Sequence, residues 1–224
     1  MNWQKRSDQL ELIDLGSQHY TQGEYFDCLH QLGKVGEYLG GDRASYKAID
    51  LLFPRPTSIL DVGCGGGDFT QKLGKRYSSC QIKGIDISSK AVSYAKMHNQ
   101  GNNVTFDSCF LCNIPSKSYD VVISTLVCHH LNDAELILFL KDCTRIAKKA
   151  VIINDLHRHP LAWLAFILSA PILFRNRLIT HDGALSIKRA FTKKDWQGYL
   201  EAFHAKGKIT WHWPFRWIVT LEPQ

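Results

Sequence analysis

Short apolar runs alternate with longer segments of mixed polarity through the middle of the chain. Runs rich in Val, Ile and Leu predict strands at 58–62, 81–87, 104–109, 119–124 and 150–154. The intervening segments predict helices at 68–77, from Ser88 to about 100, and from Asn132 or Asp133 to about 148. Buried strands that alternate with helices indicate a mostly parallel sheet covered on both faces.

The two ends of the chain follow other patterns. The first 50 or so residues predict helices, with a break at Gly40-Gly41 and with Asp42 as the cap of a helix over 44–53. Beyond the fifth strand, an insertion precedes a helix at about 193–206. The tail 208–222 holds two strand-like runs split by Pro214, which predicts a hairpin with one antiparallel strand.

These elements define the predicted architecture. We expect an α/β fold: a doubly wound, seven-stranded, mostly parallel sheet of the Rossmann-like type. An N-terminal helical cap is assigned to 1–56, and the core domain to 57–224, with a helical lid insertion at 156–190.

Composition and charge narrow the classes of partner. The 224 residues are 45% apolar and carry 27 Lys+Arg against 21 Asp+Glu, a formal net charge of +6. The high apolar fraction and the small net charge exclude a disordered chain, and the length suffices for one large core. Because the basic residues are not clustered on one element, we predict no nucleic-acid partner.

Seven cysteines bear on the compartment and on metal binding. The N-terminus is polar, which predicts no secretory leader and therefore reduced thiols in the cytoplasm. Cys109 and Cys112 form a lone CxxC pair. Since a structural zinc site needs four ligands and no second pair follows, we predict no metal site.

The longest apolar stretch, 161–174, is too short to span a membrane, which takes about 20 residues. Its aromatic residues are Trp163, Phe166 and Phe174. Four interpretations stay open: a pocket for a hydrophobic acceptor, a homodimer contact, ordinary packing of a lid helix, and a peripheral membrane contact. For the last of these, the flanking basic residues Arg158, Arg175 and Arg177 would suit phospholipid headgroups.

The sequence ILDVGCGGG (59–67) is the most informative motif. It places Asp61, Gly63, Gly65 and Gly67 between a strand and a helix, where glycines permit a tight turn and close approach of a flat ligand. Asp86 ends the next strand and can accept hydrogen bonds from a ribose diol. Together these residues predict a nucleoside site at the carboxyl edge of the sheet.

The residue at position 68 indicates which of two kinds of nucleoside ligand the site would bind. A dinucleotide fingerprint, GxGxxG, would require a glycine there, and the chain has Asp68. A carboxylate at the start of the helix would repel a pyrophosphate. Asp61 and Asp68 instead suit a cationic ligand, such as S-adenosyl-L-methionine (AdoMet), which carries a sulfonium and an ammonium group.

The ordered motifs ILDVGCGGG, GIDIS and YDVVISTLVCHHL resemble those of class I AdoMet-dependent methyltransferases. The resemblance covers about 40–155 and is closest to small-molecule enzymes similar to the ubiquinone and menaquinone methyltransferases. The later stretch HDGALSIKRAFTKKDW resembles a segment of bacterial small-molecule methyltransferases. These likenesses imply O- or C-methylation of a hydrophobic aromatic, polyketide or quinone-like acceptor.

The resemblance also implies a set of cofactor-binding residues. These are Arg43 for the methionine carboxylate, Asp61 and Gly63 for the amino end, Cys64, Gly65 and Gly67 along the turn, Asp86 for the ribose, Ile87 beside the adenine, and Ser124 and Thr125 beside the methionine and the acceptor. The family usually has an acidic residue for the adenine amino group where this chain has Phe110. We therefore expect adenine to be held by stacking, by the Leu111 backbone or by Ser108.

Three histidines are candidates for a catalytic base: His129, His130 and His181. His181 is followed by Asp182 and Gly183, and the other interpretation of this triplet is a turn capped by Asp182. A non-catalytic AdoMet-binding protein is the alternative to an enzyme. The stretch STLV after the fourth strand lacks the proline-containing turn of amino-methylating enzymes, which again disfavours nucleic acid as substrate.

Overall fold

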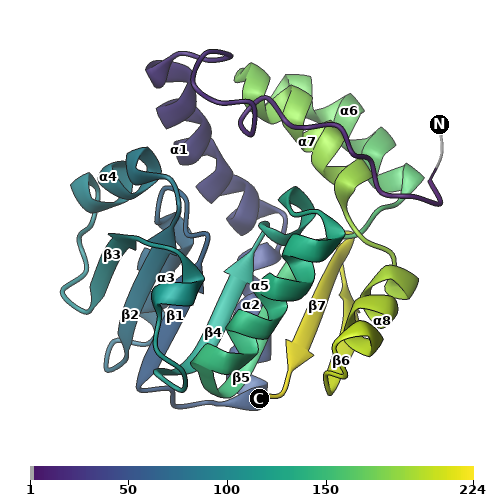
Figure 1. Cartoon of the computed structure of the whole chain (residues 1–224). Coiled ribbons are helices and arrows are strands. Elements are labelled where there is room, and N and C mark those ends of the chain that lie inside the picture. Colours follow the sequence, from purple (N-terminus) through teal and green to yellow (C-terminus); the bar gives the residue numbers. More distant parts are fainter. Residues whose placement is uncertain (1–2) are drawn as a thin grey trace.

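A computed structural model describes residues 3–224 and shows one sheet between two layers of helices (Figure 1). The strands are β1 (Ser58–Val62), β2 (Gln81–Asp86), β3 (Val104–Ser108), β4 (Tyr119–Thr125), β5 (Ala147–Leu156), β6 (Gly207–His212) and β7 (Arg216–Leu221). Their order is β3-β2-β1-β4-β5-β7-β6. Strands β1 to β5 are parallel, and β7 is antiparallel to both β5 and β6. The predicted doubly wound sheet and its closing hairpin are confirmed.

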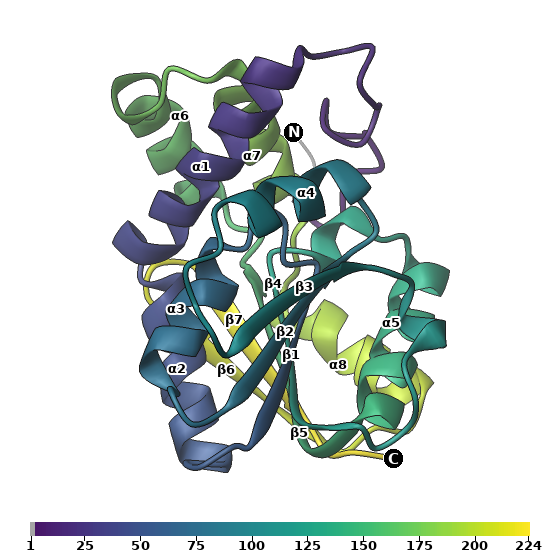
Figure 2. The ribbon, with the colours of Figure 1, turned by 90° about the vertical axis from the view of Figure 1, so that its left-hand side faces the viewer.

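Helices cover both faces of this sheet. The helices are α1 (Gln22–Tyr38), α2 (Gly41–Leu52), α3 (Asp68–Arg76), α4 (Ser89–Met97), α5 (Asp133–Ile146), α6 (Pro160–Leu173), α7 (Arg177–Arg189) and α8 (Lys193–Ala202), with short 3₁₀ turns η1 (Leu111–Asn113) and η2 (Cys128–His130). Figure 2 shows α2 and α3 on one face, and α5 and α8 on the other. Each face encloses an apolar cluster, built around Ile49 and Leu73 on one side and around Leu140 and Trp196 on the other.

A third group of elements lies above the carboxyl edge of the sheet. Helices α1, α6 and α7 meet there, and the N-terminal segment runs along them (Figure 1). Two arginines, of which Arg158 is buried and Arg6 is partly buried, fix this segment through backbone carbonyls. Arg158 donates to the carbonyls of Trp3 and Ala190, and Arg6 donates to those of Arg189 and Leu131.

Several predicted details differ from the structure. Residues 3–20 contain no helix, and the last helix ends at Ala202 rather than at about 206. Asp42 was expected to cap α2, but Gly40 occupies the N-cap with a φ of 70°. Asp42 is instead buried in the first turn and pairs with Lys72 at 3.0 Å, because a left-handed glycine already turns the chain into the helix.

Helix α6 turns its aromatic side chains inward and its aliphatic ones outward. Phe166 and Phe174 pack against the cluster of Cys28, Leu178 and Ile179. The exposed side carries large aliphatic residues: Leu161, Leu164, Ile167, Leu168, Ile172 and Leu173. Among residues 3–224, no helix combines the length and apolarity that crossing a membrane requires.

The three arginines that flank α6 in the sequence have different surroundings. Arg158 is buried and pairs with Asp195 at 3.0 Å. Arg177 pairs with Glu24 at 2.7 Å. Arg175 and Arg177 both lie exposed near the end of the helix.

The contact between α6 and α7 gives a test of the lid packing. A Cβ on Gly183 would lie 2.3 Å from the Phe166 ring, whereas a Cβ on Gly198 in α8 would meet no atom within 4 Å. We expect Gly183→Ala to lower the free energy of unfolding by about 1–3 kcal/mol through overpacking. Gly198→Ala should raise it by about 0.5–1 kcal/mol, because alanine is the better helix former. Denaturant unfolding measures both, and a shift of the two variants in the same direction would contradict the packing described.

Candidate active site

The glycine-rich turn joins β1 to α3 at the carboxyl edge of the sheet. Gly63, Gly65 and Gly67 have φ values of 72°, 51° and 77°, which glycine adopts without strain. A Cβ on Gly63 would lie 2.3 Å from Val127, and one on Gly67 would lie 2.6 Å from the Phe106 ring. The turn therefore needs glycine both for its backbone conformation and for its close neighbours.

Asp86 fixes this turn from the end of β2. Its Oδ2 accepts a hydrogen bond from the Gly65 amide at 2.9 Å, and its Oδ1 accepts one from the Ser88 amide at 2.8 Å. The carbonyl of Ile85 accepts two more, from the amides of Gly63 and Cys64. The carboxylate predicted to face a ribose is thus in place and half-buried at the turn.

Asp61 lies beneath the turn with 2% of its surface exposed. The hydroxyl of Thr70 donates to its Oδ2 at 2.6 Å. Burial raises the pKa of Asp61 to about 7, and the nearby Asp86 acts in the same direction. A cation placed at this carboxylate would restore its charge, and a pyrophosphate would be repelled.

Two apolar side chains stand exposed beside the ends of β2 and β3. Ile87 is 75% exposed and Phe110 is 65% exposed. The two strands are paired, with Asp86 opposite Ser108, so both residues follow the same edge of the sheet. Large exposed apolar side chains at this place suit a flat ring. The Leu111 carbonyl already accepts a hydrogen bond from Arg145, at 3.1 Å.

The end of β4 approaches the turn from the other side. The Ser124 hydroxyl donates to the carbonyl of Val62 at 2.9 Å, so it is used within the sheet. Thr125 differs: its Oγ1 is buried without a hydrogen-bond partner among residues 3–224. Leu126 has a φ of 58°, a strained conformation that is common at functional sites.

Two further residues, Cys64 and Arg43, were predicted to bind the cofactor. Cys64 is half-buried in the turn, where burial raises the pKa of its thiol. Arg43 lies exposed on α2, beside a hollow that is also lined by Tyr46, Lys72 and Arg76. The structure describes no contact between Arg43 and the glycine turn, so its predicted role has no support from the geometry.

The adjacent histidines of η2 have carboxylates at both ring nitrogens. His129 is buried, with Nδ1 at 2.7 Å from Asp155 and Nε2 at 3.8 Å from Glu11. His130 has Nδ1 at 2.9 Å from Asp14 and Nε2 at 3.9 Å from Glu11. Although burial opposes it, the neighbouring carboxylates raise the pKa of His130.

His181 lies elsewhere, on the outer side of α7. Its side chain is 57% exposed, and Nδ1 lies 2.8 Å from Asp182. The alternative of a capped turn at His181–Gly183 is wrong, because all three residues lie inside a continuous helix. Asp182 instead accepts hydrogen bonds from the amides of Leu12 and Ile13 and so fixes the N-terminal segment.

Sequence reasoning missed the residues that the N-terminal segment contributes. Glu11 is buried between η2 and α7, and Ser186 donates to it at 2.9 Å. Leu29 and Tyr25 of α1 lie over the cofactor turn, with the Tyr25 hydroxyl 3.2 Å from that of Ser88. A single Glu in a polar segment carries no signal of such a contact, since its partners lie more than 100 residues away.

Comparison with known families agrees with the motif resemblance. Residues 59–150 match the family described as "Methyltransferase domain". The chain is 32% identical over 141 residues to a ubiquinone biosynthesis O-methyltransferase of Nitrosomonas europaea, covering 58% of this chain and 57% of that protein. A protein of the same name from Neisseria meningitidis serogroup A is 28% identical over 126 residues, covering 52% and 51%. The chain thus spans little more than half the length of these relatives.

Solved structures confirm the fold over most of the chain. The plantazolicin methyltransferase BpumL, solved with a triazolic analogue and SAH, aligns with a TM-score of 0.69 at 17% identity, covering 94% of this chain and 93% of that one. A SAM-dependent methyltransferase from Aquifex aeolicus gives 0.66 at 17% identity, covering 88% and 97%. The predicted class I methyltransferase fold is confirmed.

The buried carboxyl of Asp61 gives a pH-dependent prediction. Because its pKa is near 7 in the folded chain against 3.8 ordinarily, wild type loses stability as the pH rises between about 4 and 7. Asp61→Asn has no carboxyl group at this position, so its free energy of unfolding should not fall in this way. The free energy of unfolding of the variant minus that of wild type should therefore increase from pH 4 to pH 7 by up to about 4 kcal/mol, at about 1.4 kcal/mol per pKa unit. Denaturant unfolding at several pH values measures it.

Asp107→Asn is the control for this experiment. Asp107 is an exposed β3 residue whose pKa Lys83 lowers, so its replacement should give no such gain. If the difference in free energy of unfolding between Asp61→Asn and wild type did not change with pH, Asp61 would be ionised in the folded chain across the range.

Proposed function

We propose that this chain, whose residues 59–150 form a methyltransferase domain, binds AdoMet at the turn after β1 and transfers its methyl group to a small hydrophobic acceptor. The observation that carries the proposal is the arrangement at the carboxyl edge. Three left-handed glycines lie between Asp61 and Asp86, in a place where acidic groups suit a cation.

The residues around the turn fit each part of the cofactor. Asp61 would attract the ammonium end, and Asp86 would accept from the ribose diol in place of one of its present amide donors. Ile87 and Phe110 would hold the adenine between apolar surfaces. The unpartnered hydroxyl of Thr125 is a buried polar group that a bound ligand would satisfy.

The names of the relatives and the position of the lid support the proposed class of acceptor. The relatives are named for O-methylation in ubiquinone biosynthesis, which supports an aromatic or quinone-like acceptor with a hydroxyl nucleophile, and methylation at carbon is the alternative. AdoMet supplies an electrophilic methyl on sulfur, and the chain's part is to align the acceptor with it. The segment over the carboxyl edge, with α6 and α7, would exclude water from that transfer.

The catalytic base stays a prediction. The Nδ1 atoms of His129 and His130 are held by Asp155 and Asp14, and the Glu11 carboxylate lies in front of both Nε2 atoms, at 3.8 and 3.9 Å, where an acceptor would have to approach. His181 is exposed on the outside of α7. If a histidine acts as the base, the N-terminal segment has to withdraw Glu11 first.

Calorimetry with AdoMet tests the cofactor assignment. We expect wild type to bind one equivalent and Asp86→Ala to bind at least about tenfold more weakly, since hydrogen bonds to a charged group contribute about 1.5–3 kcal/mol. Asp86→Asn, which keeps one acceptor oxygen, should lie between them. Binding should also strengthen as the pH rises through 7, where Asp61 becomes charged.

The matched control is Asp107→Ala on the neighbouring strand, whose affinity should equal that of wild type. Absence of binding by wild type, or equal affinity of all four proteins, would exclude this cofactor site. Turnover is measured separately as S-adenosylhomocysteine released with catechol or hydroquinone acceptors. Binding without release of this product would favour the non-catalytic alternative.

A second candidate is a peripheral membrane enzyme that methylates a lipid-like acceptor. The observation that favours it is the exposed aliphatic side of α6, where Leu168 and Ile172 are 65% and 84% exposed. Exposure of such an apolar surface to water is unfavourable in free energy, and the surface suits the boundary of a bilayer. The exposed Arg175 lies next to it.

Vesicle flotation tests this candidate. We expect wild type to float with anionic phospholipid vesicles and the double variant Leu168→Ser with Ile172→Ser to stay in solution, because the apolar contact is lost. Leu138→Ser with Met97→Ser removes two equally exposed apolar residues from α5 and α4 and should leave flotation unchanged. A wild type that stays in solution as a dimer would assign the α6 surface to a second copy of the chain.

A further inference from the structure

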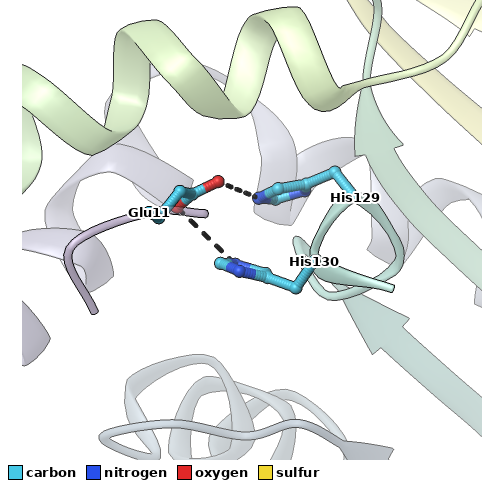
Figure 3. A group of neighbouring side chains, drawn as sticks. All are labelled: Glu11, His129 and His130. Atoms are coloured by element: carbon cyan, nitrogen blue, oxygen red, sulfur yellow. Dashed lines mark ion pairs between the residues drawn. The ribbon is translucent and has the colours of Figure 1, made fainter. Parts of the chain in front are cut away.

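Three side chains from distant parts of the chain converge at η2. Glu11 comes from the N-terminal segment, and His129 and His130 come from the turn after β4 (Figure 3). One potential ligand atom of each lies within 4.8 Å of the other two. The Nε2 atoms of both histidines point at the same carboxylate, at 3.8 and 3.9 Å from its oxygens.

These distances suit a cation better than direct hydrogen bonds. A donor and acceptor in a hydrogen bond are about 2.7–3.2 Å apart, so neither Nε2 is bonded to Glu11. In a tetrahedral zinc site with bonds of about 2.0–2.1 Å, neighbouring ligand atoms lie about 3.3–3.4 Å apart. The two distances from Glu11 to the Nε2 atoms therefore exceed this spacing by about half an ångström. All three ligand atoms lie within 4.8 Å of one another, so no pair has to shorten by more than about 1.5 Å around a metal ion.

The partners on the far sides of the rings are those of metal-binding histidines. Asp155 holds Nδ1 of His129 at 2.7 Å, and Asp14 holds Nδ1 of His130 at 2.9 Å. A carboxylate at Nδ1 fixes the tautomer with the proton on that nitrogen, so the Nε2 lone pair faces the centre of the cluster. Both rings show this arrangement although their carboxylates come from different elements.

Two guanidinium groups lie beside the cluster, and both donate to the backbone around the histidines. Arg6 donates to the carbonyls of His129 and Leu131. Arg189 lies 3.8 Å from Glu11 and 3.7 Å from Asp14, and its nitrogens donate to the backbone carbonyls of His129, His130 and Gln9. It therefore fixes the backbone that carries both histidines. Three carboxylates, those of Glu11, Asp14 and Asp155, surround the two rings, so the cluster has anionic groups for a dication to neutralise.

We propose that Glu11, His129 and His130 bind a divalent transition-metal ion of the zinc type, with Asp14 and Asp155 orienting the rings. Two imidazoles and one carboxylate are a donor set that zinc accepts, and three protein ligands leave a fourth position for water or an oxygen ligand. His130 is the half-exposed member, so solvent reaches the cluster from its side. The proposal rests on the geometry of these side chains and not on the proposed AdoMet function.

Metal binding to the apo-protein tests the proposal without any assay of turnover. The background carries Cys109→Ser and Cys112→Ser, which removes the two thiols of the CxxC pair, one partly buried and one exposed. Calorimetry should show one Zn²⁺ per chain, and Co²⁺ should give the visible absorption of a tetrahedral site. Zn²⁺ should also raise the melting temperature, since it binds the folded chain.

Three variants separate this site from the alternatives. Glu11→Gln should lose stoichiometric binding, and Asp14→Asn, near the surface, should bind about 10–100-fold more weakly while keeping the fold. His181→Gln removes an exposed histidine outside the cluster and should bind as the background does. No saturable binding by the background protein, or equal binding by all three variants, would overturn the proposal.

Discussion

The candidate cofactor site depends on one carboxylate and the backbone that it holds. Asp86 accepts from the amides of Gly65 and Ser88, and so it joins the turn after β1 to the start of α4. The preceding carbonyl, that of Ile85, fixes the first half of the same turn. Because both ends of the turn are tied to β2, the left-handed glycines are held in one conformation, which a ligand finds already formed.

The elements above the carboxyl edge of the sheet are held together differently, by buried and partly buried arginines that donate to backbone carbonyls. Arg6, Arg158 and Arg189 join the N-terminal segment, the lid and η2 in this way. Such contacts satisfy carbonyls of irregular chain that has no sheet or helix to pair with. They also explain how a polar segment of about 20 residues keeps a defined course over the sheet edge.

The sheet, its helices and the cofactor turn were predictable because their signals are local. Strand periodicity, Ser88 and Asn132 as caps, and the glycine spacing all lie within a few residues of what they specify. The cap of α2 was assigned wrongly because Gly40 and Asp42 are both favourable there and only tertiary contacts choose between them. The inward orientation of Phe166 depends on Gly183 in the next helix. The position of Glu11 depends on Asp182 and Ser186, and neither is near it in sequence.

Glu11 lies 118 residues before His129, far outside the stretch that matches the methyltransferase domain. A fragment cut at the boundaries of that match would keep both histidines and lose the carboxylate they face. Engineering of the chain therefore has to treat the first 20 residues as part of the surroundings of η2. A tag, a truncation or a fusion at the N-terminus would change the surroundings of η2 without touching any residue of the shared domain.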